Sequence, residues 1–327
     1  MSDQPVERPR RLFPTISTAA VLGLFFASLF LIFLTNRFSP TAAAERSPSI
    51  PTSGGSIAYL GDFAICYRTT GADHGNPPVV LLLGGPGESG LGYHDCFRFL
   101  DSSRQVISYD PRGSGLSQVK PGLSHYTVNA LVAELEAVRE HIAEAESVIV
   151  IARGFGAAVA VRYALEYPGR VDRFILLSPM PPDGTRYDSI FDLLRETVGA
   201  LTAAGIPPAD PVAADRWQDR YSLATDHALG ANQVPAARLA SPHASYGAAR
   251  SLLISLASSR RWTARDVMPL PVSTLALLGP DEDLPEILPV LLPHVHVVRM
   301  PAIPQALILR CDPAMVETVL HFLTKGV

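Results

Sequence analysis

The residues with the clearest spacing for chemistry lie between positions 148 and 179, which read as a strand, a sharp turn, a helix and a second strand. The turn has the sequence A-R-G-F-G over residues 152–156. A turn of the form G-x-S-x-G exposes a serine hydroxyl beside a helix N-terminus, where it can attack a carbonyl in acyl transfer. Gly154 occupies the serine position, and residues 149–177 contain no serine. The segment therefore keeps the frame of a nucleophile turn without its nucleophile.

Apolar runs that end in glycine or turn residues predict the strands that must position this turn. They cover residues 61–70, 78–83, 105–109, 148–152, 174–178, 272–278 and 295–300. Helices are predicted at 127–144, 155–167 and 313–323, the first with Thr127 as N-cap. The alternation of strands and helices predicts an α/β protein with a mostly parallel sheet covered on both faces.

This alternation stops between residues 179 and 266. The stretch is helix-like but interrupted by prolines, so we expect a helical cap inserted over the C-terminal edge of the strands. The core would then have two parts, residues 57–178 and residues 267–327.

Composition limits the possible partners and sites. The chain has 327 residues, of which 47% are hydrophobic, enough for one large core with an inserted subdomain. A net charge of -4 gives no indication of a nucleic-acid partner. There is no C-x-x-C spacing, so we expect neither a metal nor a cofactor.

The three cysteines leave two interpretations open. An exported domain can form one disulfide and leave one thiol, and Cys96 and Cys311 follow loops that we expect at the same sheet edge. They are the best candidate pair. The alternative, given equal weight, is that the cysteines are buried thiols.

The N-terminus predicts a membrane anchor. Residues 16–34 are an uncharged apolar run, nearly long enough as a helix to cross a hydrocarbon core of roughly 30 Å. Arg8, Arg10 and Arg11 precede the run, so we expect residues 1–15 to stay cytoplasmic and the rest to be exported. This predicts a single-pass protein of the cell inner membrane with a periplasmic or extracellular domain.

The competing interpretation of the N-terminus is a cleaved signal peptide. Residues 42–44 are alanines that fit an A-x-A cleavage site, but the apolar run is longer than a usual signal h-region and ends well before them. Residues 35–56 are rich in Ser, Pro, Thr and Ala and predict a flexible tether.

Several segments, in order, resemble the proline iminopeptidase branch of the α/β-hydrolases. L-L-L-G-G-P-G at 81–87 is similar to the branch's H-G-G-P-G loop, with Leu83 at the histidine position. Y-D-P-R-G-S-G-L-S at 109–117 resembles D-Q-R-G-x-G-x-S, and residues 131–142 resemble the helix that carries D-x-E-x-x-R-x-x-L. The turn at 152–156 then corresponds to the nucleophile elbow. The resemblance implies the α/β-hydrolase fold from about residue 57 to the C-terminus.

The resemblance also implies acyl transfer by a triad in the chain order Ser, Asp, His. Gly154 stands at the nucleophile position. Glu282 or Asp283 stands at the acid position, although a solvated acidic turn is the alternative for both. Ile303 stands where the histidine is expected. Two of the three triad members are therefore replaced.

Part of a binding apparatus is expected to survive. The resemblance places the N–H groups of Gly85 and Phe155 at the former oxyanion position, at a helix N-terminus that favours anions. Arg153 adds a positive charge nearby and makes this a candidate pocket for a small anionic or carbonyl ligand. The alternative is that Arg153 pairs with a neighbouring acid.

The leading hypothesis is a membrane-anchored, non-catalytic protein of this fold that binds or assembles with another protein. The alternative is an active serine-type aminopeptidase or esterase with relocated catalytic residues. The serines nearest the expected site are Ser89, Ser114, Ser117 and Ser178, of which Ser114 and Ser117 belong to a loop where turn hydrogen bonding is their expected role.

No histidine is well placed to serve such a serine. His94 and His125 are nearest the rim, and each is expected on the surface or in a loop. His294 and His296 are expected at the surface of the last strand.

Overall fold

The structure, a computed structural model, describes residues 47–48, 54–83, 89–183, 251–252, 255–256, 268–302 and 311–326. All of them lie in one compact unit, Ala42–Val327. The predicted anchor, most of the predicted cap, Gly85 and Ile303 lie outside these residues. Within the described ranges, no helix combines the length and apolarity needed to cross a bilayer.

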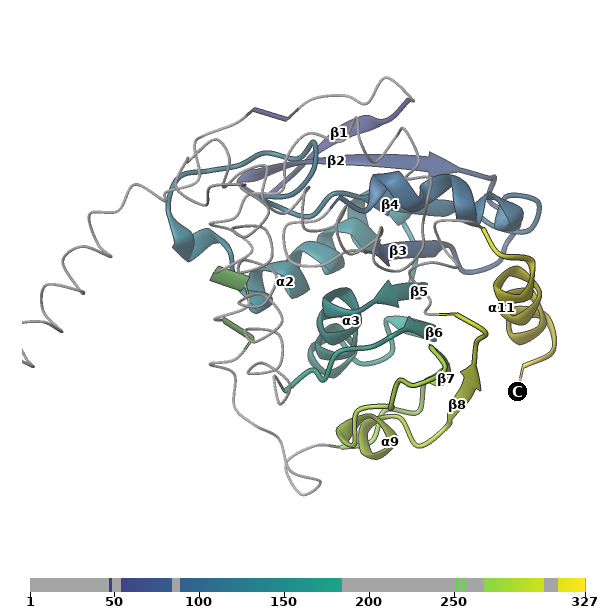
Figure 1. The fold of residues 1–327 in the computed structure, drawn as a ribbon. Coiled ribbons are helices and arrows are strands. Elements are labelled where there is room, and N and C mark those ends of the chain that lie inside the picture. The colour runs from purple at the N-terminus through teal and green to yellow at the C-terminus, as the bar shows by residue number, and fades with distance from the viewer. Residues whose placement is uncertain are drawn as a thin grey trace, which may run out of the picture. The chain divides into compact units, whose positions relative to one another are not determined.

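The described residues form a sheet of eight strands in the order β1-β2-β4-β3-β5-β6-β7-β8 (Figure 1). Strand β2 runs antiparallel to β1 and β4, and every other neighbouring pair is parallel, as the sequence predicted. The strands are β1 Ser56–Leu60, β2 Phe63–Thr70, β3 Val79–Leu83, β4 Val106–Tyr109, β5 Val148–Arg153, β6 Val171–Leu177, β7 Ser273–Leu278 and β8 Val295–Arg299. Strand β1, which pairs with β2 at one edge of the described sheet, was not among the strands predicted from the sequence.

Helices cover both faces of the sheet (Figure 1). One face carries α2 (Val128–Val138), its π-helical extension η3 (Arg139–Ala143), α3 (Phe155–Glu166) and α9 (Ile287–Leu291). The other carries the 3-10 helix η1 (Leu91–Leu100) and α11 (Pro313–Lys325), while the short η2 (Leu123–His125) precedes α2.

The two cores explain why the central strands are continuous apolar runs. Along β5, Val148, Val150 and Ala152 belong to one core cluster, whereas Ile149 and Ile151 belong to the other. Successive side chains of a strand point to opposite faces, so a strand covered on both faces needs apolar residues at every position.

Helix α2 begins where the sequence predicted. The Thr127 side chain accepts a hydrogen bond from the Ala130 N–H at 3.1 Å. Apolar residues recur at the helical period along this segment: Val128, Leu131, Leu135 and Val138 are buried, and Ile142 is half-buried. The single helix predicted over 127–144 instead changes to π geometry at Arg139 and ends at Glu144, which is left-handed with φ 48.

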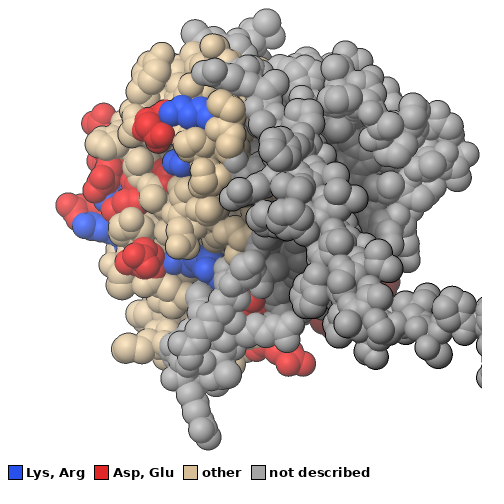
Figure 2. All heavy atoms as spheres, turned by 90° about the vertical axis from the view of Figure 1, so that its left-hand side faces the viewer, with Lys and Arg blue, Asp and Glu red and all other residues tan. Residues whose placement is uncertain are grey.

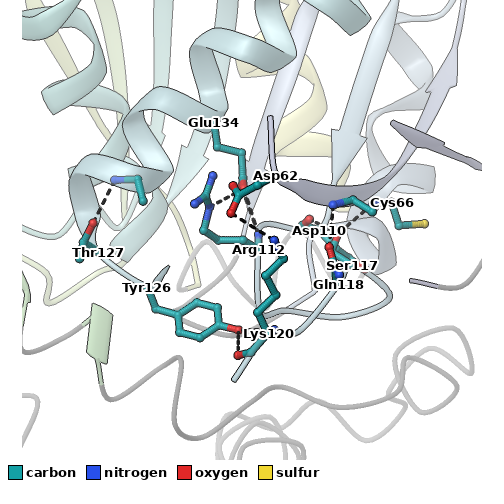
Figure 3. Close-up of polar contacts among 12 residues, drawn as sticks. Asp62, Cys66, Asp110, Arg112, Ser117, Gln118, Lys120, Tyr126, Thr127 and Glu134 are labelled. Atoms are coloured by element: carbon teal, nitrogen blue, oxygen red, sulfur yellow. Dashed lines mark hydrogen bonds and ion pairs between the residues drawn. The ribbon is translucent and has the colours of Figure 1, made fainter. Parts of the chain in front are cut away.

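A hydrogen-bonded loop connects β4 to the elements around it (Figure 3). The buried carboxylate of Asp110 accepts hydrogen bonds from the Ser89 hydroxyl at 2.6 Å and from the N–H groups of Gly90, Leu91 and Leu116 at 2.8, 3.2 and 2.7 Å. Burial raises the pKa of Asp110, while these hydrogen bonds lower it. The carboxylate therefore holds the start of η1 and the far end of its own loop together.

The same loop is tied to α2 by a buried ion pair. Arg112 Nε lies 2.8 Å from the carboxylate of Glu134, which also accepts the Arg112 backbone N–H at 3.1 Å (Figure 3). The Arg112 guanidinium stacks over the Phe63 ring at 4.6 Å. Burial raises the pKa of Glu134, and Arg112 opposes that shift. These contacts fix α2 beside the loop that follows β4.

Charges on the described surface are mixed. In the face shown in Figure 2, Lys and Arg side chains of the described residues lie close to Asp and Glu side chains. This pattern agrees with the small net charge of the chain.

The expectation for His94 was wrong, because this side chain is completely buried in η1. Its Nδ1 lies 2.7 Å from the Ser108 hydroxyl and its Nε2 lies 2.9 Å from that of Thr70. Burial lowers the pKa of His94 to about 4 from the ordinary 6.5. His94 is a structural residue on the face of the sheet covered by η1.

The buried histidine makes stability pH-dependent. Because the pKa of His94 is lower in the folded chain, its contribution is complete above pH 6.5 and is lost as the pH falls towards 4. We expect the free energy of unfolding to fall by about 3 kcal/mol over this range through His94 alone. Urea denaturation at several pH values would measure the slope. His94→Gln should flatten it, and His321→Gln on the exposed face of α11 is the control.

Candidate functional site

The turn from β5 to α3 has the backbone geometry of a sharp elbow. Gly154 has φ 53 and ψ -118, a conformation that residues with a side chain rarely adopt. Its N–H donates to the Leu177 carbonyl at 3.0 Å, and its carbonyl accepts the Met180 N–H at 3.1 Å. The turn is thus held between α3 and the end of β6.

The two glycines of the turn have different reasons to be glycine. A Cβ atom on Gly154 would meet no atom of the described residues within 4 Å. A Cβ atom on Gly156 would lie 2.2 Å from the carbonyl oxygen of Leu82 in β3. Close packing of α3 on β3 therefore requires Gly156, whereas at position 154 a Cβ atom meets none of the described residues and the backbone conformation is what disfavours a side chain.

Phe155 and Arg153 flank Gly154 on opposite sides. Phe155 begins α3 and is buried, and helix geometry leaves its N–H without an i-4 carbonyl acceptor. Arg153 ends β5 and is half-buried, with Nη2 3.4 Å from the Tyr93 hydroxyl and its guanidinium 5.4 Å from the Tyr93 ring. The structure thus places an arginine and a helix N-terminus next to the elbow, and their role in ligand binding stays a prediction.

Glu282 lies at the C-terminal end of β7, in the neighbouring part of the same sheet edge. Its Oε2 accepts hydrogen bonds from the Ser178 hydroxyl at 2.7 Å and from the Gly279 N–H at 2.8 Å. Ser178 directly follows β6 and has a left-handed backbone with φ 44. The carboxylate therefore has a serine as its partner.

Asp283, the other candidate acid, lies differently. Its side chain is 84% exposed, and its Oδ1 is 3.7 Å from Arg299 Nη2. Arg299 also donates to the carbonyls of Gly279, Pro280 and Glu282. Of the two carboxylates, Glu282 faces inward and Asp283 belongs to the solvated turn.

Three of the alternative serines lie around Asp110, Ser114 and Ser117 in its own loop and Ser89 before η1. Ser89 donates to the Asp110 carboxylate, and Ser117 donates to the Asp110 carbonyl while accepting the Cys66 N–H at 2.8 Å. Ser114 is buried in the same turn, where its N–H donates to the Pro111 carbonyl. The side-chain contacts of Ser117 are structural, as expected, whereas the buried Ser114 hydroxyl has no hydrogen-bond partner among the described residues.

The remaining histidines named from the sequence lie away from the elbow turn. His125 packs against the ring of Phe63, with ring centroids 5.7 Å apart. His294 is exposed before β8 and His296 is exposed within it.

The adjacent parallel strands β5, β6 and β7 bring Gly154, Ser178 and Glu282 together at one edge of the sheet. Gly85 and Ile303 lie outside the described residues.

Comparison with known proteins supports the same family that the residues suggest. A sequence profile for the alpha/beta hydrolase fold matches residues 77–204. The proline iminopeptidase of Lactobacillus helveticus strain DPC 4571 is 35% identical over 135 residues, which cover 38% of this chain and 43% of that protein. The proline iminopeptidase of Arabidopsis thaliana is 26% identical over 225 residues, 68% of this chain and 52% of that protein.

The chain has the α/β-hydrolase fold and is similar to proline iminopeptidases over part of its length. It spans about 43% of the length of the first of these relatives. Solved structures agree on the fold: an enol-lactonase from Burkholderia xenovorans LB400 has a TM-score of 0.57 at 20% identity, covering 83% of this chain and all of that one. A Bacillus megaterium epoxide hydrolase has a TM-score of 0.62 at 16% identity, also covering 83% of this chain and 100% of its own.

The Ser178–Glu282 hydrogen bond was not predicted from the sequence, where Ser178 was a candidate nucleophile in need of a histidine and Glu282 a candidate acid to orient one. Residues 178–272 separate β6 from β7 in the chain, so the adjacency of the two strands is a property of the sheet. The sequence held one indication of this contact: both residues follow the C-terminal end of a predicted parallel strand, and such ends meet at one edge of the sheet.

Proposed function

We propose that this protein is a non-catalytic α/β-hydrolase-fold protein that serves as a binding or assembly partner of another protein. The observation that carries the proposal is the elbow, which keeps its backbone geometry at Gly154 without a nucleophile. The scaffold of a serine hydrolase is retained, and the atom that would attack the substrate is absent.

The expected loss of activity is large enough to decide between the two hypotheses. Removing the serine or the histidine of such a triad costs about 10⁶ in kcat. Oxyanion-hole binding alone leaves about 10³–10⁴ over the rate in water. With glycine at the serine position, 154, and isoleucine at the histidine position, 303, the expected catalytic rate is too low for a useful peptidase.

The Glu282 contacts support the same proposal. A triad acid orients a histidine, but Glu282 accepts hydrogen bonds from Ser178 and Gly279. These two donors stabilise the carboxylate in place without any histidine. The acid position is thus stable as a structural element of the β6–β7 edge.

We further propose that residues 16–34 anchor the protein in the cell inner membrane as a single-pass helix, with the folded domain on the periplasmic or extracellular side. This rests on the apolar run and on the arginines before it. Recovery of the full chain in the membrane fraction after carbonate washing would agree with an anchor, and recovery in the soluble fraction would exclude it.

A fluorophosphonate probe tests the non-catalytic proposal directly. We expect the wild-type protein to remain unlabelled and to show no turnover above background on proline-aminoacyl and short-ester substrates. The matched variant combines Gly154→Ser with Ile303→His, because position 154 has room for the new side chain. We expect labelling of this variant at residue 154. Labelling or turnover by the wild type would contradict the proposal.

The second candidate function is a hydrolase with relocated catalytic groups. It is favoured by one observation, the 2.7 Å hydrogen bond from the Ser178 hydroxyl to a carboxylate at the same sheet edge. The variant Ser178→Ala separates the two candidates in the same assay. If wild-type labelling occurs and Ser178→Ala abolishes it, the second candidate replaces the first.

A further inference from the structure

Two cysteines that are far apart in the sequence meet on one face of the sheet. Cys96 lies in η1 and is 6% exposed, among the residues of the core beneath η1 and α11. Cys311 directly precedes α11 and is exposed. Figure 1 shows η1 and α11 on the same side of the sheet.

The two side chains are neighbours in space. Burial and the nearby Cys311 thiol both raise the pKa of the Cys96 thiol, and all three cysteines of the chain are thiols in the structure. Neighbouring thiols can be joined by a disulfide when their side-chain geometry allows the S–S bond.

The backbone at Cys311 is also unusual. This residue has φ 49, in the left-handed region where glycine and asparagine are favoured. The cysteine sits in the turn that precedes Asp312, the N-cap of α11, whose side chain accepts the Ala314 N–H at 2.9 Å. Cys311 therefore occupies a backbone conformation that disfavours most side chains, and its position is next to Cys96.

Cys66 provides a contrast within the same chain. It is completely buried in β2, and its backbone N–H is bound by the Ser117 hydroxyl. Burial raises the pKa of the Cys66 thiol to about 12, and burial raises the pKa of the Cys96 thiol as well. The difference between them is therefore one of position, because Cys96 lies beside the exposed Cys311 while Cys66 lies within β2.

We infer that Cys96 and Cys311 form a reversible intramolecular disulfide, and that the pair is a redox modification site for small disulfides of the glutathione class. The bridge would join η1 to the start of α11 and so connect the two elements that cover this face of the sheet. This inference is independent of the proposed function, because it requires neither a nucleophile at Gly154 nor a partner.

The reaction proceeds by two thiol–disulfide exchanges. The exposed Cys311 meets the oxidant first. Its thiolate attacks one sulfur of oxidised glutathione, the glutathione S–S bond breaks, and one glutathione leaves as a thiolate that takes up a proton. Cys96 then loses its proton and attacks the Cys311 sulfur, which releases the second glutathione. Two protein thiols are oxidised, and one small disulfide is reduced to two thiols.

Thiol counting on the full-length protein tests the inference. The protein is equilibrated with excess reduced or excess oxidised glutathione, alkylated, and analysed by peptide mass spectrometry. We expect oxidised wild-type protein to keep one of its three thiols and to yield one linked peptide pair containing Cys96 and Cys311. Cys311→Ser, at an exposed position, should keep both of its remaining thiols, and Cys66→Ala should lose both of its own.

The thermal midpoint gives a second readout that does not depend on peptide recovery. A bridge across so long a segment should raise the Tm of the oxidised wild type by roughly 5 °C or more over the reduced form. Cys311→Ser should show no such difference. The inference is overturned if oxidised wild-type protein keeps three thiols, carries only glutathione on Cys311, links Cys311 between chains, or links Cys66.

Discussion

Replacing Gly156 with alanine should lower the free energy of unfolding by about 3 kcal/mol or more, while the same change at Gly154 should cost only about 1–2 kcal/mol. The added methyl group at 156 would lie 2.2 Å from the Leu82 carbonyl oxygen and 3.1 Å from the Leu82 Cγ. Helix α3 would have to move away from β3, which loosens packing across the core. At 154 the methyl group meets open space, and only the φ of 53 is unfavourable.

Chemical denaturation of the two alanine variants measures this difference. Gly169→Ala is the matched control for backbone strain, since Gly169 also has a positive φ, 82, and open space around its Cβ position. We expect Gly154→Ala and Gly169→Ala to behave alike and Gly156→Ala to be far less stable. Equal losses at 154 and 156 would mean that α3 does not pack on β3 as closely as described.

Replacing Asp110 with alanine should destabilise the protein by about 4 kcal/mol. The substitution removes the acceptor for one hydroxyl and three backbone N–H groups, all in or beside the buried part of the loop. Each buried donor left without an acceptor costs about 1–3 kcal/mol, although such costs do not add fully. The loop also leads from β4 towards α2, so its loss should loosen the elements that support the elbow.

Asp110→Asn is the informative control for this substitution. Its side-chain oxygen can still accept the three hydrogen bonds made to Oδ1, but its amide group would face the N–H of Leu116. We expect a loss of about 2 kcal/mol, intermediate between wild type and Asp110→Ala. If Asp110→Ala unfolds at the same denaturant concentration as wild type, Asp110 does not hold the loop together.

Both glycines of the elbow have structural reasons that do not depend on catalysis. Gly154 satisfies the strained turn without the conformational cost that a serine would bear there, and Gly156 preserves the packing of α3 on β3. Architecture alone is therefore sufficient to keep both glycines.

Much of the fold could be predicted from the sequence, because the relevant signals are local. Seven of the strands follow from apolar runs, and the start of α2 follows from Thr127 and its apolar stripe. The missing serine is equally local, since the frame around Gly154 identifies the position without knowledge of its neighbours. The π-helical end of α2 and the burial of His94 were not predictable in this way, because they depend on packing against other elements.

Tertiary structure decided the pairs of residues. Glu282 and Asp283 are equivalent as sequence neighbours, but only Glu282 faces the Ser178 hydroxyl, because β7 lies beside β6 in the sheet. The contact between Cys96 and Cys311 likewise exists because η1 and α11 cover the same face. The sequence by itself determined which residue types occupy the elbow and its strands, since periodicity and turn chemistry act over a few residues. Which residues contact one another at the sheet edge depends on the tertiary structure, because it places strands that are distant in the chain side by side.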